Sequence, residues 1–211
     1  MHIYFYLLFV CIDYGFLPTF ANCPKLTLAA RTKVAQFNDN HHHHSPKTTI
    51  DNAIPPMLKY VNTGIVFSEI PDETTLAINL SNCPCRCPGC HSAYLWEDIG
   101  TPLMPDSLDA LVKKVEADIT CVAFMGGDAD PMAVAALARH LRQAHPALRR
   151  AWYSGRIRMP RNFEKTLFHY IKLGPYIKHL GPLTSPTTNQ HLYKQTSDGN
   201  FEDITQCLWK K

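Results

Sequence analysis

The sequence predicts an α/β protein with a mostly parallel sheet, arranged as a partial, open (β/α) barrel. Short apolar runs alternate with segments of helical periodicity between residues 74 and 155, which favours parallel strands joined by helical crossovers. Each run is followed by glycine, cysteine or polar residues, which are typical of ligand loops at the carboxyl edge of such a sheet. The chain has 211 residues, and a closed eight-unit barrel typically needs about 250, so we expect an open one.

Three strands and two helices account for this alternation. We expect strands at 74–80 (TTLAINL), 119–125 (ITCVAFM) and 150–155 (RAWYSG), which are rich in apolar and β-prone residues. The segment 105–119 has leucine and valine at helical spacing after a Pro-Asp start, and 131–146 is an Ala- and Leu-rich helix stopped by proline. The irregular segments NCPCRCPGCH, GGDAD and SGR follow the three strands, so all three should meet at one edge of the sheet.

The first 56 residues differ from the rest of the chain. The apolar start, MHIYFYLLFVCIDYGF, lacks the basic residues of a signal peptide, and residues 24–56 are polar and irregular. The histidines at 41–44 are best explained as part of a solvated, low-complexity tail. Two interpretations remain, a disordered extension or a start assigned too early, and we favour a working domain at 57–211 that begins near Met57.

Composition limits the possible functions. A net charge of +3 is too small to indicate nucleic acid binding, and no stretch of eighteen apolar residues predicts a membrane span. Four of the eight cysteines lie in one loop, while Cys11, Cys23, Cys121 and Cys207 are isolated. Clustering of this kind favours a metal site over a disulfide framework, and therefore a cytoplasmic protein.

The cysteine loop is the strongest chemical signal. Cys83, Cys87 and Cys90 stand at C-x3-C-x2-C spacing, which allows one tight loop to hold a 4Fe-4S cluster and leaves one iron without a protein ligand. The alternative is structural zinc bound by these three thiols and Cys85, or with His91 replacing one of them. The crowded C-x-C-x-C arrangement disfavours tetrahedral zinc, so the cluster is the favoured hypothesis and Cys85 is expected to be a spectator.

These motifs together resemble the radical S-adenosylmethionine superfamily. CPGCH followed by Trp96, then FMGGDADP, AWYSGR and the tail YIKLGPYIKHLGPLTSPTTNQHLYK, resemble its anaerobic ribonucleoside-triphosphate reductase activating proteins. The resemblance covers about residues 57–211. One departure is His169, which stands where this family often has an acidic residue.

The resemblance implies an oxidoreductase with two cofactors. A 4Fe-4S cluster on Cys83, Cys87 and Cys90 would bind S-adenosylmethionine through its fourth iron. An electron donor such as flavodoxin or ferredoxin would drive cleavage to methionine and a 5′-deoxyadenosyl radical, and that radical would take a hydrogen atom from a glycine of the reductase. Alternatives are another glycyl-radical enzyme or a small metabolite as the substrate, or a non-enzymatic zinc-binding module.

The resemblance also implies contacts to S-adenosylmethionine in all three segments. The implied residues are Gly89, Cys90, His91, Gly126, Gly127, Asp128 and Ser154. Asp128 would accept a hydrogen bond from the methionyl ammonium. Without the cysteine loop, the two central glycines would be explained as a turn and Asp128 or Asp130 as a helix cap. For Ser154, a plain turn stays an equal alternative.

The tail combines glycine and proline without a regular period. Its three Pro-containing turns suit either a surface that admits the glycine loop of another protein or a closing strand at 176–178 followed by coil. Both interpretations stay open at this point. Cys121 lies within an apolar strand and is expected in the core.

Overall fold

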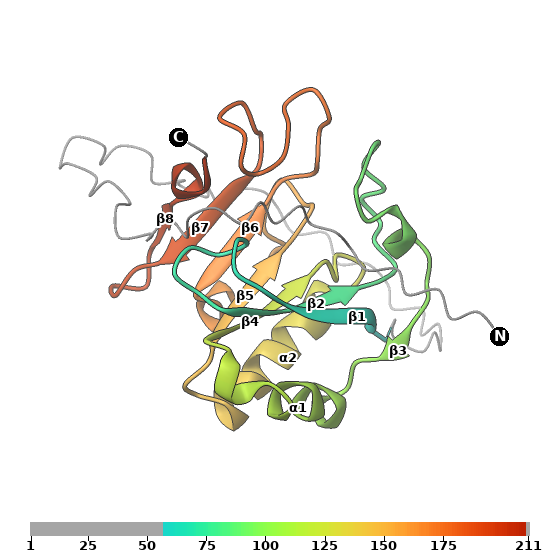
Figure 1. Ribbon diagram of the computed structural model, residues 1–211, viewed down its shortest axis with the longest axis vertical. Helices are drawn as coiled ribbons and strands as arrows, with labels where there is room; N and C mark the ends of the chain where they lie inside the picture. The colour runs from blue at the N-terminus through green and yellow to red at the C-terminus, as the bar shows by residue number, and fades with distance from the viewer. Residues whose placement is uncertain (1–56, 210–211) are drawn as a thin grey trace, which may run out of the picture. The chain divides into compact units, whose positions relative to one another are not determined.

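The computed structural model describes residues 57–209, so the expectations for 1–56 and for the histidines at 41–44 lie outside the described residues. These residues form an α/β fold with one eight-stranded mixed sheet in the order β3-β1-β2-β4-β5-β6-β7-β8 (Figure 1). The strands are β1 (Lys59–Val66), β2 (Thr75–Leu80), β3 (Thr101–Pro102), β4 (Cys121–Met125), β5 (Arg149–Tyr153), β6 (Tyr170–Leu173), β7 (His191–Gln195) and β8 (Phe201–Asp203).

The sheet has a parallel centre and antiparallel flanks. Strands β2, β4, β5 and β6 are parallel neighbours, whereas β1 and β3 on one side and β7 and β8 on the other pair antiparallel. The expectation of a mostly parallel sheet is therefore corrected to a mixed one. The sheet does not close, because β3 and β8 are separate edges.

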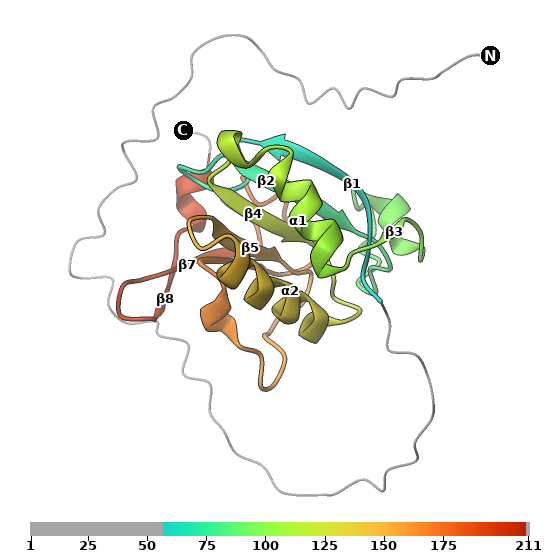
Figure 2. The same cartoon turned by 90° about the horizontal axis from the view of Figure 1, so that it is seen from below.

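Both α-helices, α1 (Pro105–Lys113) and α2 (Pro131–Ala144), lie side by side on one face of the sheet (Figure 2). Successive side chains of a strand point to opposite faces of the sheet, so each face has its own core cluster. Val122 and Phe124 of β4 belong to the core cluster that includes the apolar residues of both helices. Cys121 and Ala123 belong to a second cluster, which includes Leu208. Cys121 is fully buried, so its predicted core position is confirmed.

The helices match the sequence prediction except at one end. Helix α2 begins where expected, and Asp130 caps it by accepting a hydrogen bond from Ala133 N at 3.0 Å. Helix α1 stops at Lys113 instead of continuing to 119, because the chain tightens into a 3-10 turn over Glu116–Asp118. Within residues 57–209, no helix has the length and apolar character needed to cross a membrane.

The strand nearest to the segment 176–178 lies earlier in the chain, and it does not close the sheet. It is β6, and its ladder ends before Gly174, whose φ of +109° is the left-handed region that glycine tolerates. Pro175 follows and has no N–H to extend the ladder. The chain then forms turns with one isolated bridge between Ile177 and Gly181, so a closing strand at 176–178 is wrong.

Candidate metal and cofactor site

A cavity of about 250 Å³ lies at the carboxyl edge of the four parallel strands. All four cysteines of the loop after β2 line it, namely Cys83, Cys85, Cys87 and Cys90. Gly126 and Asp128 reach it from the end of β4, and Ser154 and Gly155 from the end of β5. The predicted meeting of the three irregular segments is therefore confirmed.

The cysteine loop is held by its own backbone. Asn82 N–H donates to Glu97 O and Cys83 N–H to Leu95 O, each at 3.0 Å, which closes the loop against the turn that follows it. Cys90 N–H donates to Cys87 O at 2.9 Å, so a tight turn joins the last two predicted ligands. These backbone bonds fix the path of the loop that carries the thiols.

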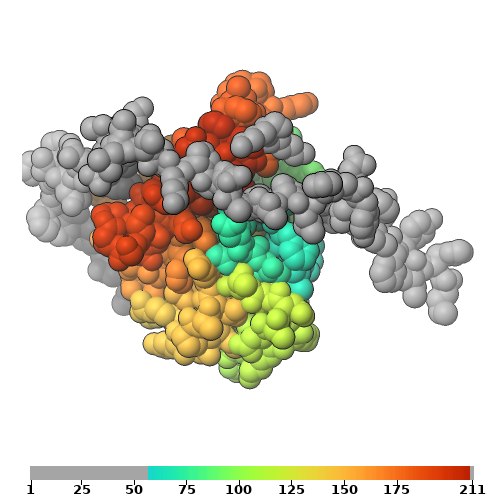
Figure 3. All heavy atoms as spheres, turned by 60° about the vertical axis from the view of Figure 1, so that its left-hand side comes forward, coloured from blue at the N-terminus to red at the C-terminus, as the bar shows by residue number. Residues whose placement is uncertain are grey.

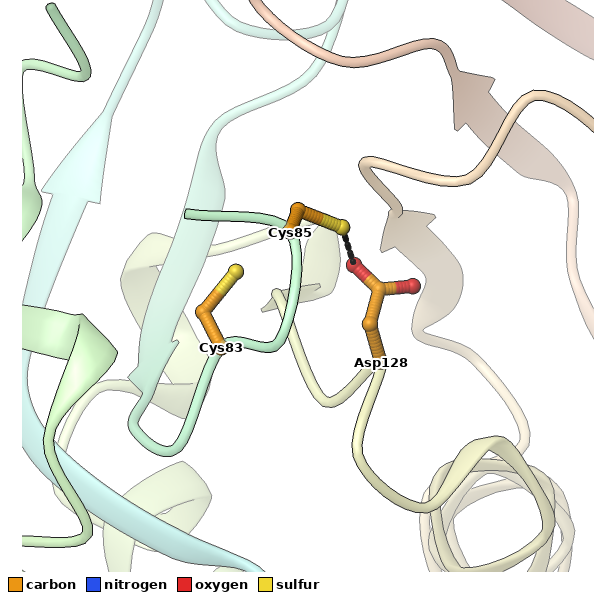
Figure 4. Close-up of side chains that lie close together, drawn as sticks. All are labelled: Cys83, Cys85 and Asp128. Carbon is orange, nitrogen blue, oxygen red and sulfur yellow. Dashed lines mark hydrogen bonds between the residues drawn. The ribbon is translucent and has the colours of Figure 1, made fainter. Parts of the chain in front are cut away.

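Cys83, Cys85 and Asp128 form a close group of possible metal ligands in the cavity (Figure 4). One ligand atom of each lies within 4.8 Å of the others, and Cys85 Sγ–H donates to Asp128 Oδ2 at 3.7 Å. The neighbouring side chain of Cys85 lowers the pKa of Cys83 to about 6, whereas Cys83 and burial raise the pKa of Cys85. Cys83 is thus favoured as the thiolate, which is the form that binds metal.

Asp128 joins the ends of β4 and β5. Its Oδ1 accepts from Ser154 Oγ at 2.6 Å, and its Oδ2 accepts from Gly155 N at 2.8 Å. Arg156 adds a hydrogen bond to the Asp128 carbonyl at 2.6 Å and places its Nε 3.5 Å from Oδ1. The side chain of Asp128 is 1% exposed, and Asp130 rather than Asp128 caps α2, so Asp128 is available to organise the site.

Sequence reasoning missed Lys172, which lines the same cavity from β6. Its Nζ donates to Gly174 O at 2.6 Å. Burial lowers the pKa of Lys172 to about 8, and Asp128 opposes this shift. The only sequence signal was a lysine between Ile171 and Leu173 in an apolar strand, and this signal does not identify the neighbours of the ammonium group.

Trp96 lines the cavity and carries a buried donor without a partner in the described residues. Its indole Nε1 is buried and has no hydrogen-bond partner within residues 57–209, although the side chain lines the cavity with the cysteines. A buried N–H normally finds an acceptor. Thiols are the ligands of iron–sulfur clusters, so the donor types that line the cavity are compatible with one.

Three of the residues implied for S-adenosylmethionine do not line the cavity. Gly89 and His91 are exposed on the cysteine loop. Gly127 is buried against α2, where a Cβ would stand 2.5 Å from Val134 Cγ2. Close packing of the turn on the helix is thus sufficient to explain glycine at position 127.

A larger cavity, of about 550 Å³, lies at the amino edge of the strands. Its buried carboxylate, Glu73, accepts hydrogen bonds from Thr120 at 2.6 Å and Tyr170 at 2.7 Å, and it pairs with Arg149 at 3.0 Å. This network satisfies Glu73 with protein groups alone. The smaller cavity is therefore the better candidate, because it combines thiols with an unpartnered donor. No family model, curated protein or solved structure matches this chain.

Proposed function

We propose that this protein is a radical S-adenosylmethionine activase that generates a glycyl radical on an anaerobic ribonucleoside-triphosphate reductase. The observation that carries the proposal is the meeting of Cys83, Cys87 and Cys90 with the ends of β4 and β5 in one cavity. This cavity brings together the loop after the first parallel strand and the Gly-Gly-Asp turn after the next one. This is the arrangement that the sequence resemblance requires.

Cys83, Cys87 and Cys90 would hold the 4Fe-4S cluster, and S-adenosylmethionine would lie beside it. The chemistry supplied by the bound pair would be one-electron cleavage of the sulfonium to methionine and a radical that takes a hydrogen atom from glycine. Flavodoxin or ferredoxin is the proposed source of the electron. The buried ammonium of Lys172 favours the negatively charged thiolates and cluster.

Asp128 is the proposed partner of the methionyl ammonium. Its Oδ2 faces the thiol of Cys85 at 3.7 Å, and a thiol is a weak donor. An ammonium group could replace that thiol with a stronger, charge-assisted bond. Ser154 and Gly155 would keep the carboxylate in place through the bonds that they already make.

The fold is compatible with a partial, open barrel. Four adjacent parallel strands, with the two described α-helices on one face, would form its central part, and we propose that the antiparallel flanks replace the missing units. An open edge would leave the cavity accessible to a protein substrate. Gly89 and His91 on the exposed loop remain proposed contacts for the adenine end.

The test is anaerobic reconstitution of the full chain with iron and sulfide, followed by mixing with S-adenosylmethionine, reductant and the candidate reductase. We expect 5′-deoxyadenosine and a glycyl doublet in the electron paramagnetic resonance spectrum. Formation of 5′-deoxyadenosine without the doublet would point to another protein or a small metabolite as the substrate. Reconstituted protein that binds no iron would refute the proposal.

A zinc-binding module is the second candidate, because Cys83, Cys85 and Asp128 approach each other within 4.8 Å. Two thiolates bound to one zinc ion lie about 3.8 Å apart, given Zn–S bonds of about 2.3 Å, so a separation within 4.8 Å is close to what zinc needs. Metal analysis after aerobic purification and after anaerobic reconstitution decides between the two, since colourless protein with one zinc per chain would support the module.

A further inference from the structure

Positive charge is concentrated in one part of the sequence, although the net charge of the whole chain is only +3. Residues 131–197 contain eleven lysines and arginines but a single acidic residue, Glu164. The cationic residues are Arg139, Arg142, Arg149, Arg150, Arg156, Arg158, Arg161, Lys165, Lys172, Lys178 and Lys194. The rest of the chain is therefore acidic on balance.

Most of these cations have a partner in the structure. Arg150 and Lys172 donate to backbone carbonyls, and two lysines stand over aromatic rings. Arg158, Arg161 and Lys178 are exposed, and their side chains have no ion pair or hydrogen bond within residues 57–209. The ion pairs are Arg139–Glu164, Arg142–Glu164, Arg149–Glu73 and Arg156–Asp128.

Two of the three unpaired cations lie within three positions of a cavity residue in the sequence. Arg158 follows the cavity residue Gly155 by three positions, and Lys178 follows Tyr176, which also lines the cavity. Gly174 N–H donates to Arg156 O at 2.8 Å, so the loops that carry the two cations are joined at their bases. The segment between β6 and β7 projects in orange at the top of the space-filling view (Figure 3).

An exposed apolar side chain accompanies this charge. Ile157 is 78% exposed and lies in the sequence between Arg156 and Arg158. An aliphatic side chain offers a polypeptide an apolar contact, whereas single-stranded nucleic acid binds to aromatic rings on which its bases stack. The combination of unpaired cations with an aliphatic residue therefore favours a polypeptide ligand that carries acidic side chains.

We propose that Arg158, Lys178 and Ile157, here called the basic rim, bind an acidic segment of the partner protein next to the glycine loop that enters the cavity. The inference rests on the proposed function in assuming that the substrate is a protein whose glycine loop enters the cavity. Charges at the rim of an interface act mainly by steering association and excluding wrong partners. The rim would thus select a glycine loop by the acidic residues around it.

The experiment measures binding of short fluorescent peptides to the full chain by anisotropy, at low and at physiological ionic strength. One peptide has a central glycine flanked by Asp and Glu, and a matched peptide has Asn and Gln at those positions. An oligothymidylate of the same length serves as a phosphate competitor. The protein variants are Arg158→Glu with Lys178→Glu, and a control, Lys113→Glu with Lys114→Glu, which makes the same charge change at exposed positions around the end of α1.

We expect the acidic peptide to bind, the amide peptide to bind at least tenfold more weakly, and the rim variant to lose about tenfold in affinity while the control keeps it. Equal binding of both peptides, or an equal loss in the control, would overturn the inference. If oligothymidylate displaces the labelled acidic peptide at a lower concentration than the unlabelled acidic peptide does, the inference is overturned as well, in favour of a phosphate polymer. Circular dichroism checks that the variants are folded. The neutral variant Arg158→Gln should show a smaller loss of affinity than the charge reversal.

The outcome is independent of the radical chemistry, since peptide binding needs neither iron nor S-adenosylmethionine. Cleavage of S-adenosylmethionine by reconstituted Arg158→Glu protein supplies the second readout. Peptide selectivity in a chain that binds no iron would support the rim and refute the activase. Cleavage that continues in a chain without peptide selectivity would refute the rim alone.

Discussion

Ser154 Oγ lies 2.6 Å from Asp128 Oδ1, and this hydrogen bond ties the end of β5 to the end of β4. The same serine oxygen accepts from Arg156 N at 3.0 Å, so Asp128 and Ser154 together order the segment that leaves β5. A buried carboxylate is stable only when its oxygens are hydrogen-bonded. Here the protein supplies those bonds from two segments of the chain.

Asp128→Asn should destabilise the fold by about 2 kcal/mol. One carboxylate oxygen becomes an NH₂ group, which cannot accept from Ser154 or Gly155, and Arg156 loses its charged partner. Urea unfolding of the metal-free chain measures the change.

Asp130→Asn is the matched control for this substitution. It changes the same chemical group two residues away, but Asn caps a helix about as well as Asp, so the cap on Ala133 N should persist. We expect a change of only a few tenths of a kcal/mol. Equal losses in the two variants would contradict the role assigned to Asp128.

Gly155→Ala tests the contact between the β5 loop and the cysteine loop. An added Cβ would stand 2.6 Å from Cys85 Sγ and 3.1 Å from its Cβ, so the cysteine side chain must rotate away from Asp128. We expect a loss of about 1–2 kcal/mol in the free energy of unfolding, and about half of that loss in a Cys85→Ala background.

Gly64→Ala provides the comparison, because no atom lies within 4 Å of the position where its Cβ would be. That substitution should be neutral or slightly stabilising. If Gly155→Ala lowers the free energy of unfolding by the same amount with and without the Cys85 thiol, contact with that thiol does not cause the loss.

Alanine substitutions of the loop cysteines should divide them into two groups. Cys83→Ala, Cys87→Ala and Cys90→Ala should each abolish iron loading, whereas Cys85→Ala should leave it mostly intact. Iron and sulfide analysis with visible absorption measures this after anaerobic reconstitution. Cys121→Ala serves as a control for thiol loss outside the site, since this residue is buried in the core. Equal loss for all four loop cysteines would disprove the ligand assignment.

The sequence predicted three of the four parallel strands and none of the antiparallel ones, and burial explains the difference except at β6, which is buried but was not predicted. β2, β4 and β5 are almost wholly buried, so their apolar runs stand out. β1 is half-buried or exposed along its length, and β7 has a single fully buried residue, Leu192. Such strands are defined by their pairing partners rather than by composition, and we did not predict them.

The candidate site was also predicted only in part. Topology alone brings the ends of parallel strands together, so the meeting of the three segments could be predicted. Contacts between particular side chains depend on rotamers and on the path of each loop. The approach of Cys85 to Gly155, and the burial of Lys172 in the same cavity, could therefore not be predicted from residue spacing.

His169 should make stability depend on pH. Burial lowers the pKa of His169 to about 4, with Arg150 and Arg149 adding to the shift, and an unfolded histidine has a pKa of about 6.5. Between these values the unfolded chain binds a proton that the folded chain does not, so the contribution of neutral His169 is complete above about pH 6.5 and is lost as the pH falls towards 4. The side chain is only half-buried, so we expect a loss of roughly 1–2 kcal/mol.

His169→Asn isolates this contribution. The imidazole Nδ1 accepts from Arg150 N at 3.2 Å, and an asparagine Oδ1 offers an acceptor that does not titrate. Urea unfolding at about pH 7 and about pH 4.5 should show that the variant loses less stability than the wild type on acidification. All other titrating groups are shared and cancel in the difference. A variant with the same pH dependence as the wild type would show that His169 is protonated as easily in the folded chain as in the unfolded one.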